Sequence, residues 1–277
     1  MTIVVTGATG HLGRAVVESL LDRGVPAASI LATGRNAEKL AELGVPTRAA
    51  SYDDPPGLRA AFDGADRVLF VSGSEVGQRI PQHRNVVDAA KAAGVGRVVY
   101  TSAPKADTSD MLLVTEHRET EKLLRDSGLP TTFLRNGWYL ENYDLDDALA
   151  RGVFGASGDG RISIAPRTDY AEAAAAALLL DDPAPVYELG GESVTLAELA
   201  AEVARQSGRD VPYTDMSVED YRRLLLDAGL PEDAATVFSD IHRAAGEGAL
   251  EVEGADLERL LGRPATPLAT AVKLALG

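Results

Sequence analysis

Residues 6–13 read Thr6-Gly7-Ala8-Thr9-Gly10-His11-Leu12-Gly13, and this stretch decides the fold. It follows a β-branched run and precedes apolar residues at helical spacing, so it predicts a strand, a tight turn and a helix. In this spacing the first glycine makes the turn, the second lets the backbone approach a pyrophosphate, and the third lets the helix pack closely on the strand. The helix N-terminus adds free N–H groups and a positive dipole end. The stretch therefore predicts dinucleotide binding, against the alternative of a glycine turn without a ligand.

Short β-branched runs alternate with helical patterns through the first half of the chain. The runs are Thr2–Thr6, Ile30–Thr33, Thr47–Ala50, Val68–Val71, Val98–Thr101 and Thr131–Leu134. Nearly all-apolar strands that alternate with helices are typical of a parallel sheet covered on both faces. We expect an α/β fold with a Rossmann-type, doubly wound parallel sheet.

The pattern changes after about residue 140, where helical patterns dominate and strand candidates become sparse. Thr195 and Glu198 have the spacing of a capping box, and the helix that they begin is expected to stop at Gly208. We therefore expect two parts: residues 1–140 form the nucleotide-binding domain, and residues 141–277 form a smaller, mostly helical region that closes a cleft with it.

Composition excludes several classes of function. The 277 residues carry 27 Lys+Arg against 42 Asp+Glu, a net charge of -15, which disfavours nucleic acids and anionic membranes as partners. There is no cysteine, and the four histidines lack metal-site spacing, so we expect no metal. The N-terminus lacks a signal-peptide pattern, and the longest apolar run is too short to span a bilayer. We expect a cytoplasmic protein, with a homodimer left open.

The end of the second expected strand selects the cofactor. NAD sites place an acid there for the ribose, about 20 residues past the glycines. This chain reads Ala32-Thr33-Gly34-Arg35-Asn36, and Arg35 offers a guanidinium that can fork onto a 2′-phosphate. The residues favour NADPH over NADH.

Three further segments are typical of one protein family: Gly34–Asn36, Ser72–Arg79 (Ser-Gly-Ser-Glu-Val-Gly-Gln-Arg) and Arg135–Asn142 (Arg-Asn-Gly-Trp-Tyr-Leu-Glu-Asn). With the glycine turn they resemble NmrA-like, atypical short-chain dehydrogenases. The chain is most similar to bacterial type 2 NAD(P)H:quinone oxidoreductases, with triphenylmethane reductases as near relatives. The resemblance covers nearly the whole chain.

This resemblance implies that NADP(H) binds in the N-terminal domain and a quinone-like small molecule in the cleft between the domains. Together with the glycine turn and Arg35, it implies a set of cofactor-binding residues: Gly7, Ala8, Thr9, Gly10, His11, Leu12, Gly13, Arg35, Asn36, Ser72, Gly73, Ser74, Arg79, Asn136, Gly137, Tyr139 and Asn142.

The Tyr-x-x-x-Lys pair of most short-chain dehydrogenases is missing, because Arg118 stands four residues before Lys122. Arginine stays protonated and cannot act as an acid. Quinone reduction fits this gap, since hydride addition gives a phenolate-like anion (phenols titrate near pH ~10) that water can protonate. The catalytic residues stay unassigned, with His117 and Tyr139 as candidates. Alternatives are an NADP(H)-binding redox sensor without catalysis and a reductase of other flat acceptors, such as triphenylmethane dyes.

Overall fold

The computed structural model describes residues 1–75 and 77–277, so Val76 of the Ser72–Arg79 segment lies outside the described residues. Seven parallel strands form the central sheet in the order β10-β6-β5-β4-β1-β2-β3. The strands are β1 (Ile3–Val5), β2 (Ile30–Gly34), β3 (Thr47–Ala49), β4 (Arg67–Phe70), β5 (Arg97–Ser102), β6 (Thr131–Asn136) and β10 (Val186–Leu189). The chain winds outward from β1 to β3, then from β4 to β10, which confirms the expected doubly wound α/β fold.

Helices cover both faces of this sheet. One face carries α1 (His11–Asp22), α7 (Arg167–Leu179) and α11 (Asp256–Leu261), and the other carries α3 (Pro55–Phe62), α4 (Arg79–Ala92) and α5 (Leu112–Ser127). Successive strand residues serve opposite faces, because side chains alternate along a strand: Ile3 and Val5 belong to the first core and Val4 to the second. The short α2 (Ala37–Ala41) follows β2.

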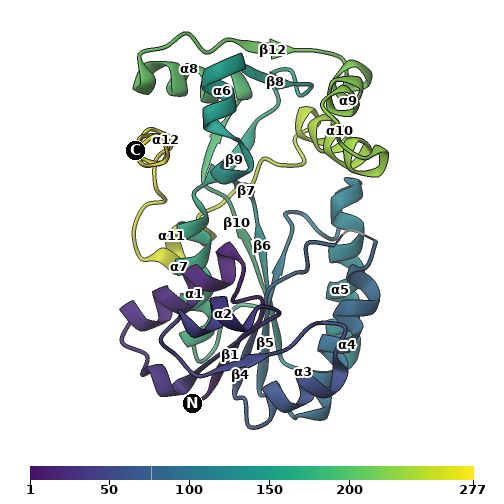
Figure 1. The fold of residues 1–277 in the computed structure, drawn as a ribbon, viewed down its shortest axis with the longest axis vertical. Helices are drawn as coiled ribbons and strands as arrows, with labels where there is room; N and C mark the ends of the chain where they lie inside the picture. The colour runs from purple at the N-terminus through teal and green to yellow at the C-terminus, as the bar shows by residue number, and fades with distance from the viewer. Residues whose placement is uncertain (76) are drawn as a thin grey trace.

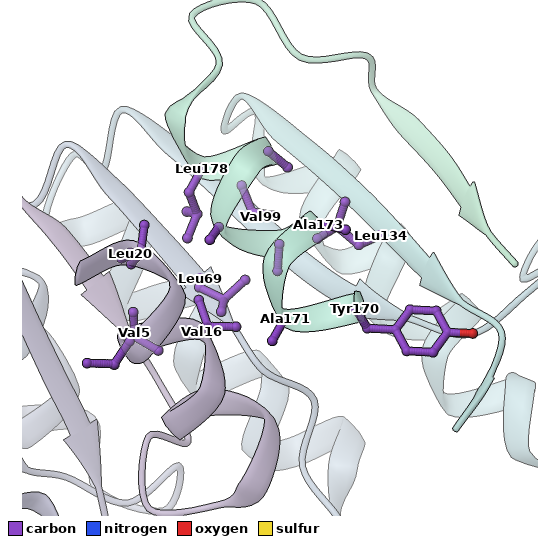
Figure 2. Packing of buried hydrophobic residues seen from close by; sticks show 14 of the residues in the cluster. Val5, Val16, Leu20, Leu69, Val99, Leu134, Tyr170, Ala171, Ala173 and Leu178 are labelled. Carbon is purple, nitrogen blue, oxygen red and sulfur yellow. The ribbon is translucent and has the colours of Figure 1, made fainter. Parts of the chain in front are cut away.

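Most of the alanine-rich run at 171–180 is core, and Figure 2 shows Ala171, Ala173 and Leu178 within it. Ala171, Ala173 and Ala174 of α7 are at most 1% exposed and pack with Val16 and Leu20 of α1. Small side chains let these two helices approach closely over the sheet. In the described part of the chain, no helix has the length and apolarity needed to cross a membrane.

The smaller region lies beyond the C-terminal ends of the strands (Figure 1). It holds a sheet of β7 (Trp138–Tyr139), β9 (Ile162–Ala165) and β11 (Glu192–Val194), and the pair β8 (Val153–Gly155) and β12 (Tyr213–Asp215). Its helices are α6 (Leu145–Arg151), α8 (Leu196–Ser207), α9 (Val218–Asp227), α10 (Glu232–Gly246) and α12 (Leu268–Ala275); η1 (Ala27–Ser29) and η2 (Leu140–Asn142) are short 3-10 helices. The capping box of Thr195 and Glu198 is present, and α8 stops at Gly208.

The chain crosses between the two regions more than once. Although β10 lies beyond residue 140, it pairs with β6 at the edge of the central sheet, and α7 and α11 cover the sheet. These elements have partners far away in sequence, so no local pattern assigns them to the first region. The division into residues 1–140 and 141–277 stays a prediction. The structure shows in addition that β10, α7 and α11, all beyond residue 140, pack with the central sheet.

Candidate functional site

A cavity of about 550 Å3 opens where β1, β2 and β4 end. This is the point at which the strand order reverses, where open α/β sheets bind their ligands. Of the cofactor residues predicted from the sequence, the lining includes Gly7, Thr9, Gly10, His11, Leu12, Gly13, Arg35, Asn36, Ser72, Gly73 and Ser74. The cavity therefore gathers three sequence segments that the fold brings to one edge of the sheet.

The glycine turn forms one wall of this cavity. Gly7 has a φ of 62°, and a Cβ on Gly13 would stand 2.4 Å from the Gly7 carbonyl oxygen. Gly10 immediately precedes α1, and no side chain in the described part of the chain caps that helix. The first N–H groups of α1 and its positive dipole end are thus left for an anion.

Tyr52 supports the floor of the cavity and was not among the predicted site residues. Its hydroxyl donates to the Val71 carbonyl oxygen at 2.6 Å and lies 2.6 Å from the Thr6 Oγ1, which in turn accepts from the Val71 N–H at 3.0 Å. Burial raises the pKa of Tyr52, so the hydroxyl keeps its proton. The ring therefore joins the ends of β1 and β4 behind the glycine turn.

His83 fixes the loop that follows β4. Its Nε2 accepts the Gly73 N–H at 2.9 Å, and its Nδ1 lies 2.8 Å from the Thr120 Oγ1, whose own proton goes to the Glu116 carbonyl oxygen. These partners define a neutral ring with its proton on Nδ1. Burial lowers the pKa of His83 to about 3, in agreement with that state. This buried side chain therefore holds the backbone of a cavity-lining residue in place.

Positive groups gather where β2 ends. Arg35, Asn36 and Lys39 line the cavity, and the Asn36 side chain accepts the Lys39 N–H at 3.0 Å as the cap of α2. Glu75 faces them across the cavity, and its Oε1 lies 2.5 Å from the Arg35 Nη1. Sequence reasoning noted Glu75 only as part of a motif.

The other predicted cofactor residues lie outside this cavity. Ala8 is buried beneath the turn, and Arg79 is buried with its Nε donating to the Gly73 carbonyl oxygen at 2.6 Å. Asn136, Gly137 and Tyr139 lie at and just beyond the end of β6, and Asn142 lines a second cavity. Their assignment to the cofactor stays a prediction.

At the end of β6, Asn136 presents an unused acceptor. Its Nδ2 donates to the Tyr139 hydroxyl at 2.8 Å, whereas its buried Oδ1 finds no partner among the described residues. A buried acceptor without a donor is unfavourable, so a hydrogen bond from a ligand N–H to this oxygen would be stabilising. The Tyr139 ring packs edge-on against Tyr170, with 4.9 Å between centroids, and burial raises the pKa of Tyr139.

The second cavity, of about 200 Å3, lies in the smaller region. Aromatic and aliphatic side chains line it: Trp138, Asn142, Tyr143, Phe154, Ile162, Tyr221, Leu225, Leu230, Phe238, Ile241, His242, Ala245 and Leu250. Burial lowers the pKa of His242 to about 4, so this imidazole is neutral, and its Nδ1 accepts the Ala156 N–H at 3.2 Å. The lining holds no charged group at neutral pH and suits a neutral, flat molecule.

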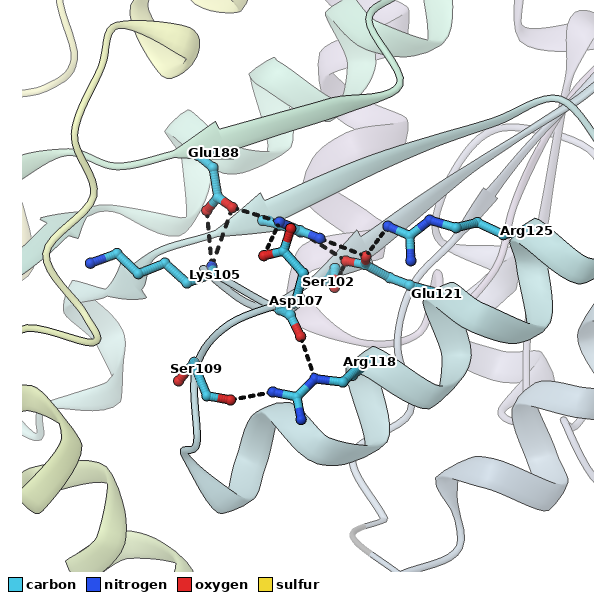
Figure 3. A network of polar contacts seen from close by, with 10 residues as sticks. Ser102, Lys105, Asp107, Ser109, Arg118, Glu121, Arg125 and Glu188 are labelled. Atoms are coloured by element: carbon cyan, nitrogen blue, oxygen red, sulfur yellow. Dashed lines mark hydrogen bonds and ion pairs between the residues drawn. The ribbon is translucent and has the colours of Figure 1, made fainter.

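Arg118, which stands where a tyrosine was expected, binds a loop. Its Nε donates to the Ala106 carbonyl oxygen at 2.8 Å, and its Nη2 donates to that of Ser109 (Figure 3). Glu188 accepts the Lys105 N–H from the opposite side at 3.1 Å. The guanidinium is thus committed to holding the 103–111 loop after β5.

A buried ion network supports the same loop. The Arg135 guanidinium, 4% exposed, contacts Glu121, Glu188 and Asp107 at 2.8–2.9 Å. Breaking such a pair by removing one partner leaves a buried charge uncompensated, so these groups are held together. The network fixes β6, β10, α5 and the loop after β5 relative to one another.

His117 is buried against Tyr100, whose hydroxyl lies 2.9 Å from the His117 Nδ1. It lines neither cavity. Burial lowers the pKa of His117 well below its usual range. Across residues 1–75 and 77–277, no group of three His, Cys, Asp or Glu side chains is placed to hold a metal ion.

The model of the NmrA-like family matches residues 1–268. The chain belongs to this family. It is 48% identical over 278 residues to quinone oxidoreductase 2 of Escherichia coli strain K12, across 98% of this chain and 97% of that protein. The family membership predicted from the motifs is therefore confirmed.

Two solved structures of similar proteins contain nucleotide. The NADPH-dependent quinone oxidoreductase of E. coli, complexed with NADPH, has a TM-score of 0.95 and 46% identity over 100% of both chains. The triphenylmethane reductase of Citrobacter sp., complexed with NADP(H), has a TM-score of 0.92 and 36% identity over 99% of this NmrA-like chain and 100% of that one.

Proposed function

We propose that this chain is an NADPH-dependent oxidoreductase that transfers hydride to a quinone-like acceptor. The observation that carries the proposal is the cavity at the strand reversal, where Arg35 occupies the position at which an NAD site places its acid and Lys39 of α2 also lines the cavity. The similar proteins named for NADPH and quinone support the same activity.

The residues present fit NADP(H). The uncapped start of α1 would receive the pyrophosphate, and Arg35 would bind the 2′-phosphate, with Lys39 lining the same cavity. The unpartnered Oδ1 of Asn136 would accept an N–H from the carboxamide of the nicotinamide. When bound, NADPH supplies the hydride.

Trp138 connects the cofactor region to the acceptor region. It follows Asn136 and Gly137 directly and lines the second cavity with Tyr143 and His242. Aromatic walls stack on a flat ring, and neutral polar groups can meet its carbonyl oxygens without charge. We place the quinone-like acceptor between Asn136 and this cavity.

The chain needs no side-chain acid for this reaction. Arg118 stays protonated and binds loop carbonyls. Burial raises the pKa values of Tyr139 and Tyr143, which makes both hydroxyls weaker acids. The reduced quinone leaves as an anion that water protonates, so the protein's task is to position the two rings and exclude side reactions.

Single-turnover oxidation of bound NADPH, with and without a simple benzoquinone, tests the proposal. We expect NADPH to bind and to be oxidised only when the quinone is added. Oxidation by a triphenylmethane dye and not by quinones would instead favour the dye-reductase alternative, whose relative in Citrobacter is similar over nearly the whole chain. NADPH binding without turnover by either acceptor would favour a redox sensor.

Cytoplasmic location and a homodimeric state stay predictions from the sequence. Gel filtration of the purified protein would test the homodimer.

A further inference from the structure

We infer that Glu75 weakens the preference of this site for NADPH, because it competes with the 2′-phosphate for the Arg35 guanidinium. The inference rests on the proposed NADPH function and adds a residue that tunes cofactor choice. The choice between NADPH and NADH then depends on the loop after β4 as well as on the residues at the end of β2.

The contact that carries the inference spans the cavity. Arg35 follows β2 and Glu75 follows β4, both line the cavity, and 2.5 Å separates Nη1 from Oε1. The side chains are 67% and 44% exposed, so a ligand phosphate can reach the guanidinium from the cavity. Arg35 therefore already has an anionic partner at the place where the phosphate must bind.

Glu75 is held in this position by a second contact. Its Oε2 accepts from the Gln82 Nε2 at 3.1 Å, and the same Nε2 lies 3.1 Å from the Asp53 Oδ2. Gln82 is only 6% exposed, so its amide is a fixed support. Hydrogen bonds from Gln82 and Arg35 lower the pKa of Glu75, which keeps the carboxylate charged at neutral pH.

The two cofactors meet this carboxylate differently. A 2′-phosphate, with a charge of about -1.5 to -2 near neutral pH, displaces Glu75 from Arg35 and stands beside an unpaired like charge. The neutral 2′-hydroxyl of NADH does not compete for the guanidinium, so the Arg35–Glu75 pair remains intact. Glu75 thus acts against NADPH and leaves NADH nearly unaffected.

Glu75→Gln tests the inference, because it removes the charge and keeps the size of the side chain. Loss of the charge ends the competition for Arg35 and the repulsion of the 2′-phosphate, so we expect NADPH to bind about 3- to 10-fold more tightly. NADH affinity should change less than about twofold. Asp63→Asn is the matched control, since it removes one exposed acid that lines neither cavity.

Calorimetric titrations with NADPH and NADH, repeated in an Arg35→Ala background, separate the outcomes. The gain for NADPH should shrink to less than half when Arg35 is absent, because the competition needs the guanidinium. An unchanged or weaker NADPH affinity in Glu75→Gln, an equal gain for both cofactors, or a gain that survives Arg35→Ala in full would overturn the inference. If the unmodified protein does not bind NADPH, the proposed function fails first. Glu75→Ala, measured in parallel, should also bind NADPH more tightly, because the effect comes from loss of the carboxylate and not from the new glutamine.

Discussion

A pair of glycine substitutions separates the two roles of the turn at residues 6–13. A Cβ on Gly13 would lie 2.4 Å from the Gly7 carbonyl oxygen, 2.7 Å from the Gly7 carbonyl carbon and 2.9 Å from the Ala8 Cα. All three are backbone atoms, so Gly13→Ala must push α1 away from the turn by about 1 Å to reach an ordinary contact. A Cβ on Gly10 meets only the Gly7 oxygen, at 3.3 Å, and Gly10 is exposed at the cavity.

The two variants should therefore fail differently. Overpacking of this kind costs about 1–3 kcal/mol, and because only backbone can yield we expect Gly13→Ala to lose about 2–3 kcal/mol, a fall in Tm of roughly 4–10 °C. It should also lose NADPH binding, since the turn moves. Gly10→Val should keep its Tm within about 2 °C, because its contact asks for only a few tenths of an ångström, yet bind NADPH at least about tenfold more weakly.

Thermal unfolding by circular dichroism and titration with NADPH measure both quantities on the same samples. Neither Gly24→Ala nor Gly57→Ala is a suitable control, because Gly24 has a φ of 80° and a Cβ on Gly57 would collide with the Asp54 carboxylate. The unmodified protein and Asp63→Asn therefore serve as references. A Gly13→Ala protein with unchanged Tm would refute the packing argument. Equal NADPH affinity in Gly10→Val would remove the dinucleotide assignment.

Three further predictions concern charge and protons. Arg35→Glu should weaken NADPH by roughly 1.5–3 kcal/mol and NADH much less, because it replaces a phosphate partner with a like charge; equal binding of both cofactors by the unmodified protein would contradict this. Tyr139→Phe, Tyr143→Phe and His117→Gln should each slow hydride transfer less than about 100-fold, the lower end for loss of a general acid. A variant that binds both ligands normally and loses about 1000-fold or more would reveal that acid. His83, whose pKa lies at about 3 in the fold, should make the protein less stable below pH 6.5, because the unfolded chain takes up a proton that the fold excludes. The free energy of unfolding, measured with denaturant, should fall between about pH 7.5 and pH 5 in the unmodified protein. In His83→Gln this fall should be smaller by about 2 kcal/mol.

The parts of the fold that could be predicted carry their signal locally. Six strands of the central sheet lie within one or two residues of their β-branched runs. Five of them are largely buried and mostly apolar, as parallel strands covered on both faces are, whereas the edge strand β3 is exposed. The Thr195–Glu198 capping box and the left-handed Gly208 need only neighbouring residues. The seventh strand, β10, carries no local sign that it belongs to this sheet, since its partner β6 precedes it by some fifty residues.

The site was predictable where one residue type has one use. The glycine spacing predicts a pyrophosphate site and Arg35 predicts a 2′-phosphate site without any knowledge of distant residues. Tyr52, His83 and Gln82 do not, because each acts by hydrogen bonds to groups that only the fold brings near: the Val71 carbonyl oxygen, the Gly73 N–H and the Glu75 carboxylate. No pattern in the sequence marks a histidine that accepts a distant backbone N–H.

The arginine at the expected tyrosine position also changes how the missing acid is understood. Arg118 holds two carbonyls of the 103–111 loop, and Lys105 in that loop adopts a φ of 51°, alone in this among the described residues other than glycine. Lys105 also reaches out of the loop, since its Nζ donates to the Gly248 carbonyl oxygen at 2.8 Å. Gly248 lies between Ala245 and Leu250, which line the second cavity. The position that supplies a proton donor in most short-chain dehydrogenases is used here to fix a loop that joins the sheet to the second cavity. The replacement of the tyrosine by Arg118 is compatible with an acceptor whose reduced form is a stable anion, such as a quinone. It is not compatible with an acceptor that is reduced to a secondary alkoxide, because that product needs a proton donor.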